Sequence, residues 1–168
     1  MEIIILLLIV FLFTVGIVNF TWSLFFSVPY VPSNNKFIKG CLEILEKENV
    51  VNVAELGAGD GRIAVAVARK GMVVDAYEIN PFLSLLIRLE KIFFAPKTLM
   101  VLNQNFEKCN FKKYDAVIVY LMPKILAKLE NKLFTQMSKN SIIISNTFKF
   151  KNHEPEKIYN KLLLYRVS

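Results

Sequence analysis

The chain has 168 residues, a formal net charge of +7 and 54% hydrophobic residues. This composition excludes a disordered chain, which needs low hydrophobicity, and two cysteines are too few for a disulfide scaffold. The length indicates about one domain and excludes a large multidomain enzyme. His153 is the only histidine, and Cys41 and Cys109 lack C-x-x-C spacing, so we expect no metal site.

An apolar run without charged residues extends from Ile3 to Val28. It is longer than the roughly 20 residues that a membrane crossing needs, so residues 1–28 are predicted to form one transmembrane helix. A cleaved signal peptide is the alternative, but the chain begins Met1-Glu2 rather than with basic residues, and no Ala-x-Ala site follows. Because lysines occur only on the C-terminal side of the run, the positive-inside rule places residues 29–168 in the cytoplasm.

Helical and strand-like patterns alternate along the rest of the chain, and a sheet that is mainly parallel and covered on both faces follows from this alternation. The fold class is therefore α/β. Helices are predicted at Asn35–Glu48, Asp60–Lys70 and Pro81–Phe94 and from Pro123 onward; strands at Val50–Leu56, Met72–Ile79, Thr98–Gln104, Tyr114–Met122 and Ser141–Ser145; and a hairpin within Glu156–Ser168 that turns near Asn160-Lys161.

The most informative motif is a glycine-rich turn between the first strand and the next helix. Gly57, Gly59 and Gly61 follow the strand directly, and glycines permit a tight turn and a close approach of a ligand to the backbone. Glu78 lies about 20 positions further on, where an acidic residue in doubly wound folds binds ribose hydroxyls. Together these features predict a nucleoside-containing ligand at the C-terminal edge of the sheet.

The spacing of the turn narrows the choice of ligand. A dinucleotide fingerprint needs a third glycine at position 62, which is Arg62, and no Walker lysine follows the turn. Glu55 would repel a pyrophosphate but suits the ammonium of an amino-acid moiety. The combination resembles the first two motifs of class I S-adenosylmethionine (SAM) methyltransferases. A purely structural glycine turn is the alternative.

A closer resemblance extends from about Val28 to Phe150. The chain is similar to the seven-strand protein-lysine methyltransferases, namely the archaeal broad-specificity enzymes and the mitochondrial enzymes that modify the c-type subunits of ATP synthase and the adenine nucleotide translocase. The segments that carry it are VPYVPS at Val28–Ser33, ELGAGDGR at Glu55–Arg62, YEINPF at Tyr77–Phe82, VIVYLMP at Val117–Pro123 and LENKL at Leu129–Leu133. The resemblance implies a Rossmann-like class I methyltransferase fold, with residues 29–168 as the methyltransferase domain.

The resemblance also implies a set of cofactor-binding residues for SAM. Those around the methionine part are Glu55, Gly57, Gly59, Asp60 and Gly61, although Asp60 also suits a helix cap. Those around the nucleoside are Glu78 at the ribose, Asn80 beside the adenosine, and Asn105-Phe106 at the adenine, where many relatives have Asp. Tyr30, Val31, Pro32 and Ser33 would fold over the cofactor as a flap; an inert linker is the alternative.

Tyr120-Leu121-Met122-Pro123 ends the fourth strand, where the substrate is expected to meet the methyl group. A lysine must lose a proton before attack, and a desolvated site depresses its pKa from about 10.4. We expect direct in-line transfer, with backbone carbonyls of Tyr120–Met122 orienting the amine, Tyr120 lining the slot or simply packing, and Pro123 fixing the turn. Phe148 and Phe150 are candidates for a channel wall, although alternating apolar residues usually pack.

The leading prediction is thus a membrane-anchored SAM-dependent methyltransferase whose partner is a protein lysine near the membrane surface. Two alternatives remain: methylation of a lipid or other small amphiphile, and a SAM-binding membrane protein without turnover. A nucleic-acid partner is disfavoured, because no aromatic-plus-basic motif accompanies the +7 charge.

Overall fold

The computed structural model describes residues 2–26, 32–94 and 96–168; the side chains of residues 12, 15, 18–26 and 94 are outside the description. The chain divides into two compact units, residues 1–31 and 32–168, and each is considered by itself. The first contains helix α1 (Glu2–Phe26), whose described large apolar side chains are exposed.

The prediction of a transmembrane helix, and with it a single-pass location with the domain facing the cytoplasm, is corrected by the structure. A crossing needs about 20 consecutive apolar residues. Within the part of the chain that the structure describes, no helix meets the length and apolarity of a membrane span. The prediction had treated the run from Ile3 to Val28 as continuous, and its last two residues lie outside the described part.

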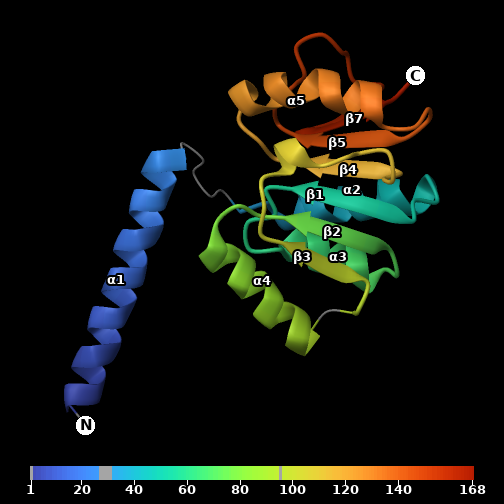
Figure 1. Ribbon diagram of the computed structural model, residues 1–168. Helices are drawn as coiled ribbons and strands as arrows, with labels where there is room; N and C mark the ends of the chain where they lie inside the picture. The colour runs from blue at the N-terminus through green and yellow to red at the C-terminus, as the bar shows by residue number, and fades with distance from the viewer. Residues whose placement is uncertain (1, 27–31, 95) are drawn as a thin grey trace. The chain divides into compact units, whose positions relative to one another are not determined.

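The second unit is a seven-stranded sheet with helices on both faces (Figure 1). The strands lie in the order β3-β2-β1-β4-β5-β7-β6, and all pairs are parallel except those that involve β7. The strands are β1 (Asn52–Leu56), β2 (Val73–Tyr77), β3 (Leu99–Leu102), β4 (Ala116–Val119), β5 (Ile142–Asn146), β6 (Lys157–Tyr159) and β7 (Leu162–Arg166). The helices are α2 (Asn35–Lys47), α3 (Arg62–Arg69), α4 (Pro81–Phe94) and α5 (Pro123–Gln136), with a short 3-10 helix η1 (Phe106–Lys108).

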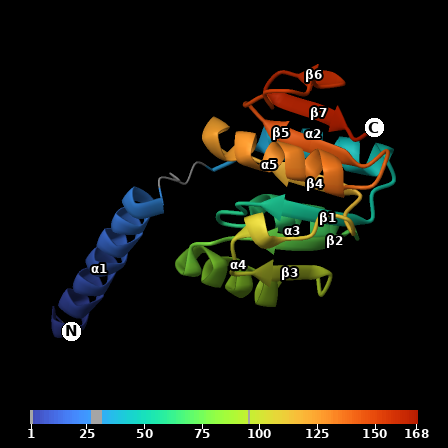
Figure 2. The same ribbon diagram turned by 45° about the horizontal axis from the view of Figure 1, so that its top comes forward.

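Apolar side chains on each face of the sheet explain why these segments fold together. On one face Cys41 and Leu45 of α2, Val67 of α3 and Ile87 of α4 join a continuous buried core. On the other face α5 contributes the leucines at positions 126, 129 and 133. The four residues of β4 are all buried, as expected of a central parallel strand (Figure 2).

The C-terminal hairpin confirms the predicted turn. Asn160 and Lys161 connect β6 to β7, and Asn160 adopts a positive φ of 56°, which asparagine tolerates better than most residues. β7 then inserts between β5 and β6, antiparallel to both. All three residues of β6 are exposed, so this short strand forms the outer edge of the sheet.

The register of the parallel strands brings the candidate site together. Leu56, the last residue of β1, pairs with Tyr77 on one side and with Val119 on the other, and Tyr77 pairs with Leu102. The segments that follow β1, β2, β3 and β4 therefore leave the sheet at the same level and the same edge. This is the edge at which open α/β sheets bind ligands.

Candidate functional site

The glycine turn after β1 is held by the end of β2. The backbone N–H groups of Gly57 and Ala58 both donate to the Tyr77 carbonyl at 2.9 Å. Gly57 and Gly61 have φ values of 76° and 81°, in the left-handed region that favours glycine. A Cβ at Gly57 would lie 3.0 Å from Leu121, and one at Gly61 would lie 2.7 Å from Ile87. Contacts within the chain thus already require two of the three glycines.

Glu78 closes the turn from the other side. Its Oε2 accepts the Gly59 N–H at 2.8 Å and its Oε1 accepts the Asn80 N–H at 2.7 Å. Burial raises the pKa of this carboxyl, and the backbone hydrogen bonds oppose the increase. Glu78 follows β2 rather than ending it, and it connects the glycine turn to the start of α4.

Glu55 is the least satisfied polar group of the site. The residue is 4% exposed, and within the described part of the chain its Oε2 has no hydrogen-bond partner. Burial raises the pKa of Glu55 well above its ordinary value; a backbone hydrogen bond from Ala64 lowers it, and the charges of Asp60 and Glu78 raise it further. A buried carboxylate without a partner is costly, and a cationic ligand group at Oε2 would remove that cost.

The segment before α2 reaches the glycine turn through Arg62, which sequence reasoning had treated only as a departure from a motif. Its Nη1 donates to the Ser33 carbonyl at 3.1 Å, and its Nε donates to Asp60 at 2.9 Å. Ser33 is buried and Pro32 is exposed. Asp60 also accepts the Arg62 N–H at 3.3 Å, which agrees with its expected capping role. Tyr30 and Val31 of the predicted flap lie outside the described residues.

Asparagines organise the nucleoside side of the site. The Asn80 Oδ1 accepts the Phe82 N–H at 2.9 Å, so it caps α4 as expected. Asn105 Oδ1 likewise accepts the Glu107 N–H at 2.8 Å and starts η1, which leaves Phe106 half-buried against the α5 side of the core. Sequence reasoning missed Asn103, whose Nδ2 donates to the carbonyls of Glu78 at 2.9 Å and Ile79 at 3.1 Å.

A buried polar network beneath the nucleoside side was also missed. The Cys109 thiol donates to the Tyr77 hydroxyl at 2.9 Å, the Tyr77 and Tyr114 hydroxyls are 2.7 Å apart, and Tyr114 donates to Asp75 at 2.6 Å. Lys113 Nζ lies 2.6 Å from the same Asp75 oxygen. Because Tyr114 has one hydroxyl hydrogen and gives it to Asp75, Tyr77 must donate to Tyr114. Burial raises the pKa of both tyrosines.

The end of β4 supplies the proposed transfer site. Leu121 is buried against Gly57, Tyr120 is half-buried, and Met122 and Pro123 are exposed. The Met122 carbonyl accepts the N–H groups of Ile125 at 2.9 Å and Leu126 at 3.1 Å, so it serves the first turn of α5. Of the three carbonyls expected to orient an amine, this one is therefore already engaged.

The two phenylalanines after β5 differ in their surroundings. Phe150 is buried, with its ring centroid 4.9 Å from that of Tyr165 and 5.4 Å from that of Phe134. It packs in the core, which was the alternative to a channel wall. Phe148 is half-buried, and its carbonyl accepts the Ser145 hydroxyl at 2.7 Å.

Comparison with known proteins identifies the arrangement. The model of the ANTKMT methyltransferase domain matches residues 55–157, more than half of the chain, from Glu55 through the glycine turn to β6. The chain belongs to the ANTKMT methyltransferase domain family. The predicted family resemblance is confirmed, and no group of His, Cys, Asp or Glu that could hold a metal occurs within the described residues.

Relatives of this family member include named lysine methyltransferases. A lysine N-methyltransferase of Xenopus laevis, named for the C-type subunits of ATP synthase, is 29% identical over 138 residues, which are 80% of this chain and 59% of that protein. A protein-lysine N-methyltransferase of Saccharolobus islandicus (strain REY15A) is 27% identical over 135 residues, 78% of this chain and 83% of that protein. The chain thus spans about three fifths of the length of the Xenopus relative.

The fold of this family member is the class I Rossmann-like methyltransferase fold. An RNA methyltransferase from Salinibacter ruber, solved in complex with S-adenosyl-L-homocysteine, superposes with a TM-score of 0.76 at 24% identity and covers 82% of this chain and 94% of its own. The predicted fold class and the mostly parallel sheet are confirmed. The class I fold is that of SAM-dependent methyltransferases, which agrees with the predicted enzyme class and cofactor.

Proposed function

We propose that the chain binds SAM and transfers its methyl group to the side chain of a protein lysine, with residues 29–168 as the catalytic part. The observation that carries this proposal is the unpartnered, buried Oε2 of Glu55 beside the glycine turn. The amino-acid part of SAM has an ammonium group, which fits this carboxylate and would lower its raised pKa. The names of the relatives support lysine as the acceptor.

The other residues take roles that follow from their positions. Gly57, Gly59 and Gly61 keep the backbone clear for the methionine part. Glu78 uses one lone pair of each oxygen for the backbone, so each oxygen retains a second lone pair for ribose hydroxyls. Asn80, Asn105 and Phe106 contact the nucleoside, and Ser33, held by Arg62, lies across the turn.

The acceptor lysine would approach the segment after β4. When bound, the cofactor supplies an electrophilic methyl group. The chain's contribution is to hold a neutral amine in line with it, through the backbone at Tyr120 and Leu121, and to exclude water at buried Leu121. An apolar site disfavours the ammonium form, so the lysine pKa falls and the reactive free amine becomes more populated.

Transfer of label from SAM tests the proposal. The full chain is incubated with methyl-labelled SAM and a protein extract, and label is then measured in protein, lipid and RNA fractions and in methyl-lysine after hydrolysis. We expect label in methyl-lysine, and its loss in Glu55→Gln. The matched control is Glu43→Gln, which changes an exposed carboxylate on α2. Label confined to lipid or RNA, or unchanged in Glu55→Gln, contradicts the proposal, and calorimetric SAM binding without label in any fraction indicates a binding protein without turnover.

A further inference from the structure

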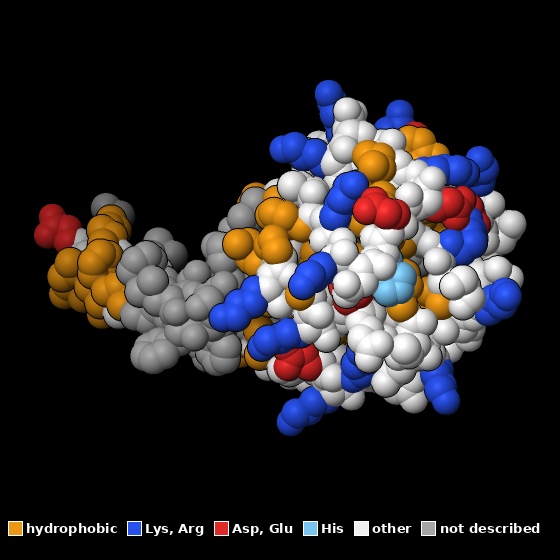
Figure 3. Space-filling view, turned by 90° about the horizontal axis from the view of Figure 1, so that it is seen from above, with side chains coloured by type: hydrophobic (Ala, Val, Ile, Leu, Met, Phe, Trp, Pro, Cys, Tyr) orange, Lys and Arg blue, Asp and Glu red, His pale blue; other side chains and the backbone are white. Residues whose placement is uncertain are grey.

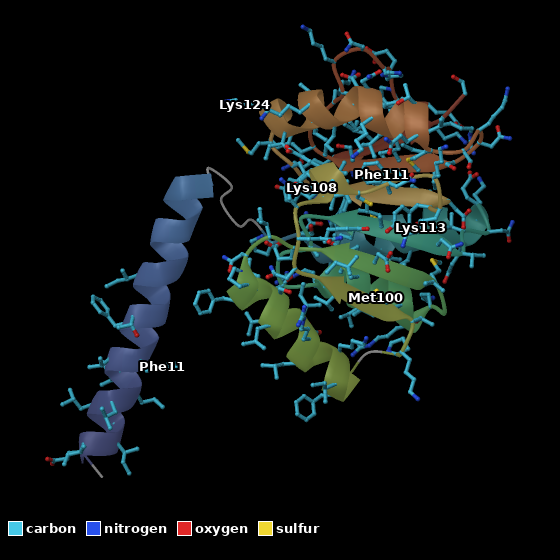
Figure 4. The ribbon with its side chains drawn as sticks, viewed as in Figure 1. Phe11, Met100, Lys108, Phe111, Lys113 and Lys124 are labelled. Carbon is cyan, nitrogen blue, oxygen red and sulfur yellow. The ribbon has the colours of Figure 1, made fainter. Side chains whose placement is uncertain are left out.

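Six lysines gather on the α5 side of the site, in two segments that are separate in the sequence. Lys108, Lys112 and Lys113 belong to the connection between β3 and β4, and Lys124, Lys128 and Lys132 recur every four residues along α5. We call these six residues the lysine surface. Figure 4 labels Lys108 and Lys113 on the connection and Lys124 at the start of α5.

Direct contacts hold the two segments side by side. Lys132 Nζ donates to the Glu107 carbonyl and lies 5.5 Å from the centroid of the Phe111 ring. The Phe111 N–H in turn donates to the Gln136 side chain at 3.3 Å. The lysines of α5 and those of the connection are therefore parts of one surface.

The positive charge of this surface is poorly compensated. Within the described residues, Lys113 is the one member in an ion pair, with Asp75 at 2.6 Å. Lys124 and Lys128 are like charges at i and i+4 on one helix face, an arrangement that destabilises a helix on its own. Figure 3 likewise shows more basic than acidic side chains on its face of the molecule. An acidic partner would relieve this repulsion.

The surface also has a hollow of about 360 Å³, lined by Lys108, Lys112 and Lys113 together with Tyr77, Gln104, Cys109 and Asn110. Two side-chain amides among three lysines supply hydrogen-bond donors suited to carboxylates. The aromatic rings here, Tyr77, Phe111 and Tyr114, are 3% exposed or less. Binding of single-stranded nucleic acid relies on exposed aromatic faces for stacking, so the surface favours an acidic polypeptide over RNA.

We propose that the lysine surface binds an acidic segment of the protein substrate, close in sequence to the lysine that is methylated. This inference rests on the proposed function, because Lys124 directly follows Pro123, the end of the segment where the acceptor amine would lie. A target lysine is itself cationic and would be repelled by this basic surface. Acidic neighbours in the substrate convert that repulsion into attraction and fix the direction of the bound segment.

Binding of synthetic peptides to the full chain tests the inference without requiring turnover. Two labelled peptides have one central lysine, flanked by glutamates in one and by glutamines in the other, and fluorescence anisotropy is measured at low and high salt. We expect the glutamate peptide to bind at least about tenfold more tightly at low salt, with most of the difference lost at high salt.

Charge reversals locate the binding. Lys112→Glu and Lys128→Glu are each expected to weaken the glutamate peptide about threefold, as befits exposed charge pairs, and the double variant about tenfold. Lys139→Glu makes the same charge change on an exposed lysine outside the surface and should have no effect. Equal binding of the two peptides, an equal loss in Lys139→Glu, or tighter binding of a single-stranded RNA that responds to the same reversals overturns the inference.

Calorimetric SAM binding separates this inference from the proposed function. If the chain does not bind SAM, the proposed function fails whatever the peptides do. If SAM binds and the glutamine peptide is methylated as well as the glutamate peptide, the proposed function stands and the lysine surface has no role in substrate choice.

Discussion

Tyr77 connects three parts of the site, so its hydroxyl is expected to affect both stability and cofactor affinity. Its carbonyl holds Gly57 and Ala58, and its hydroxyl accepts from Cys109 and donates to Tyr114. Tyr77→Phe removes the two hydroxyl bonds and keeps the backbone ones. Since a net hydrogen bond contributes about 1 kcal/mol, we expect the free energy of unfolding to fall by about 2 kcal/mol.

The loss of SAM affinity should be separable from that loss of stability. Cys109 follows η1, and Asn105 and Phe106 open it, so releasing Cys109 loosens the residues proposed to contact the adenine. We expect the Kd for SAM, measured by calorimetry, to rise about three- to tenfold, with KM for SAM following and kcat little changed.

Tyr165→Phe is the matched control for this variant. Tyr165 is also buried and its hydroxyl accepts one backbone N–H, from Phe150 at 3.2 Å, but β7 is separated from β1 by two strands. Denaturant unfolding should show a loss of about 1 kcal/mol, with the Kd for SAM unchanged. If Tyr77→Phe loses stability as expected and binds SAM as tightly as the unaltered chain, the network does not position the adenine side, and the reasoning is refuted.

Three further predictions concern charge and backbone geometry. Because burial raises the pKa of Glu55 above 4.5, stability without cofactor should fall as the pH rises through that raised pKa, and Glu55→Gln should flatten this fall in pH-dependent unfolding. Gly61→Ala places a Cβ 2.7 Å from Ile87 at a φ of 81°, so thermal unfolding should show a loss of at least about 2 kcal/mol. Burial opposes ionisation of Glu130, but hydrogen bonds from His153, Asn152 and Lys151 hold its pKa below 4.5; Glu130→Gln should lose about 2 kcal/mol at neutral pH, and the difference from the unaltered chain should shrink as the pH falls through that lowered pKa.

Controls distinguish these causes. Gly71→Ala has a similar φ of 91° but meets nothing within 4 Å, so it should be less destabilising than Gly61→Ala; an equal loss would show that the Ile87 contact is irrelevant. A pH profile for Glu55→Gln that matches the unaltered chain would show that Glu55 is not the group that titrates. A Glu130→Gln variant that loses the same stability at every pH would show that its charge is unimportant.

The sequence predicted elements well where local signals and burial agree. Asn80 and Pro81 predicted the start of α4, and the continuous apolar run around Ile118 predicted a central strand. The observed strands are shorter than the predicted ones, because the predictions followed apolar residues beyond the last ladder hydrogen bonds. The prediction of a membrane span was wrong because it rested on the composition of an apolar run as a whole.

The site was predictable as a set of residue types but not as a set of contacts. Glu55 was assigned from its distance to the glycines, and its burial without a partner needed the fold. The role of Tyr77 had no local signature, since its partners Cys109 and Tyr114 are more than 30 residues away in the sequence. Arg62 was known as a missing glycine, whereas its contact with Ser33 depends on how the segment before α2 returns to the turn.

The hairpin at the end of the chain has a consequence for solubility. An exposed outer strand offers unpaired backbone groups to other sheets, and the usual safeguards are short length and lysine side chains. β6 has three residues and begins with Lys157, and the strand inside it, β7, is fully covered on both sides. The terminal hairpin thus protects the long central strands from edge-to-edge aggregation during synthesis and storage.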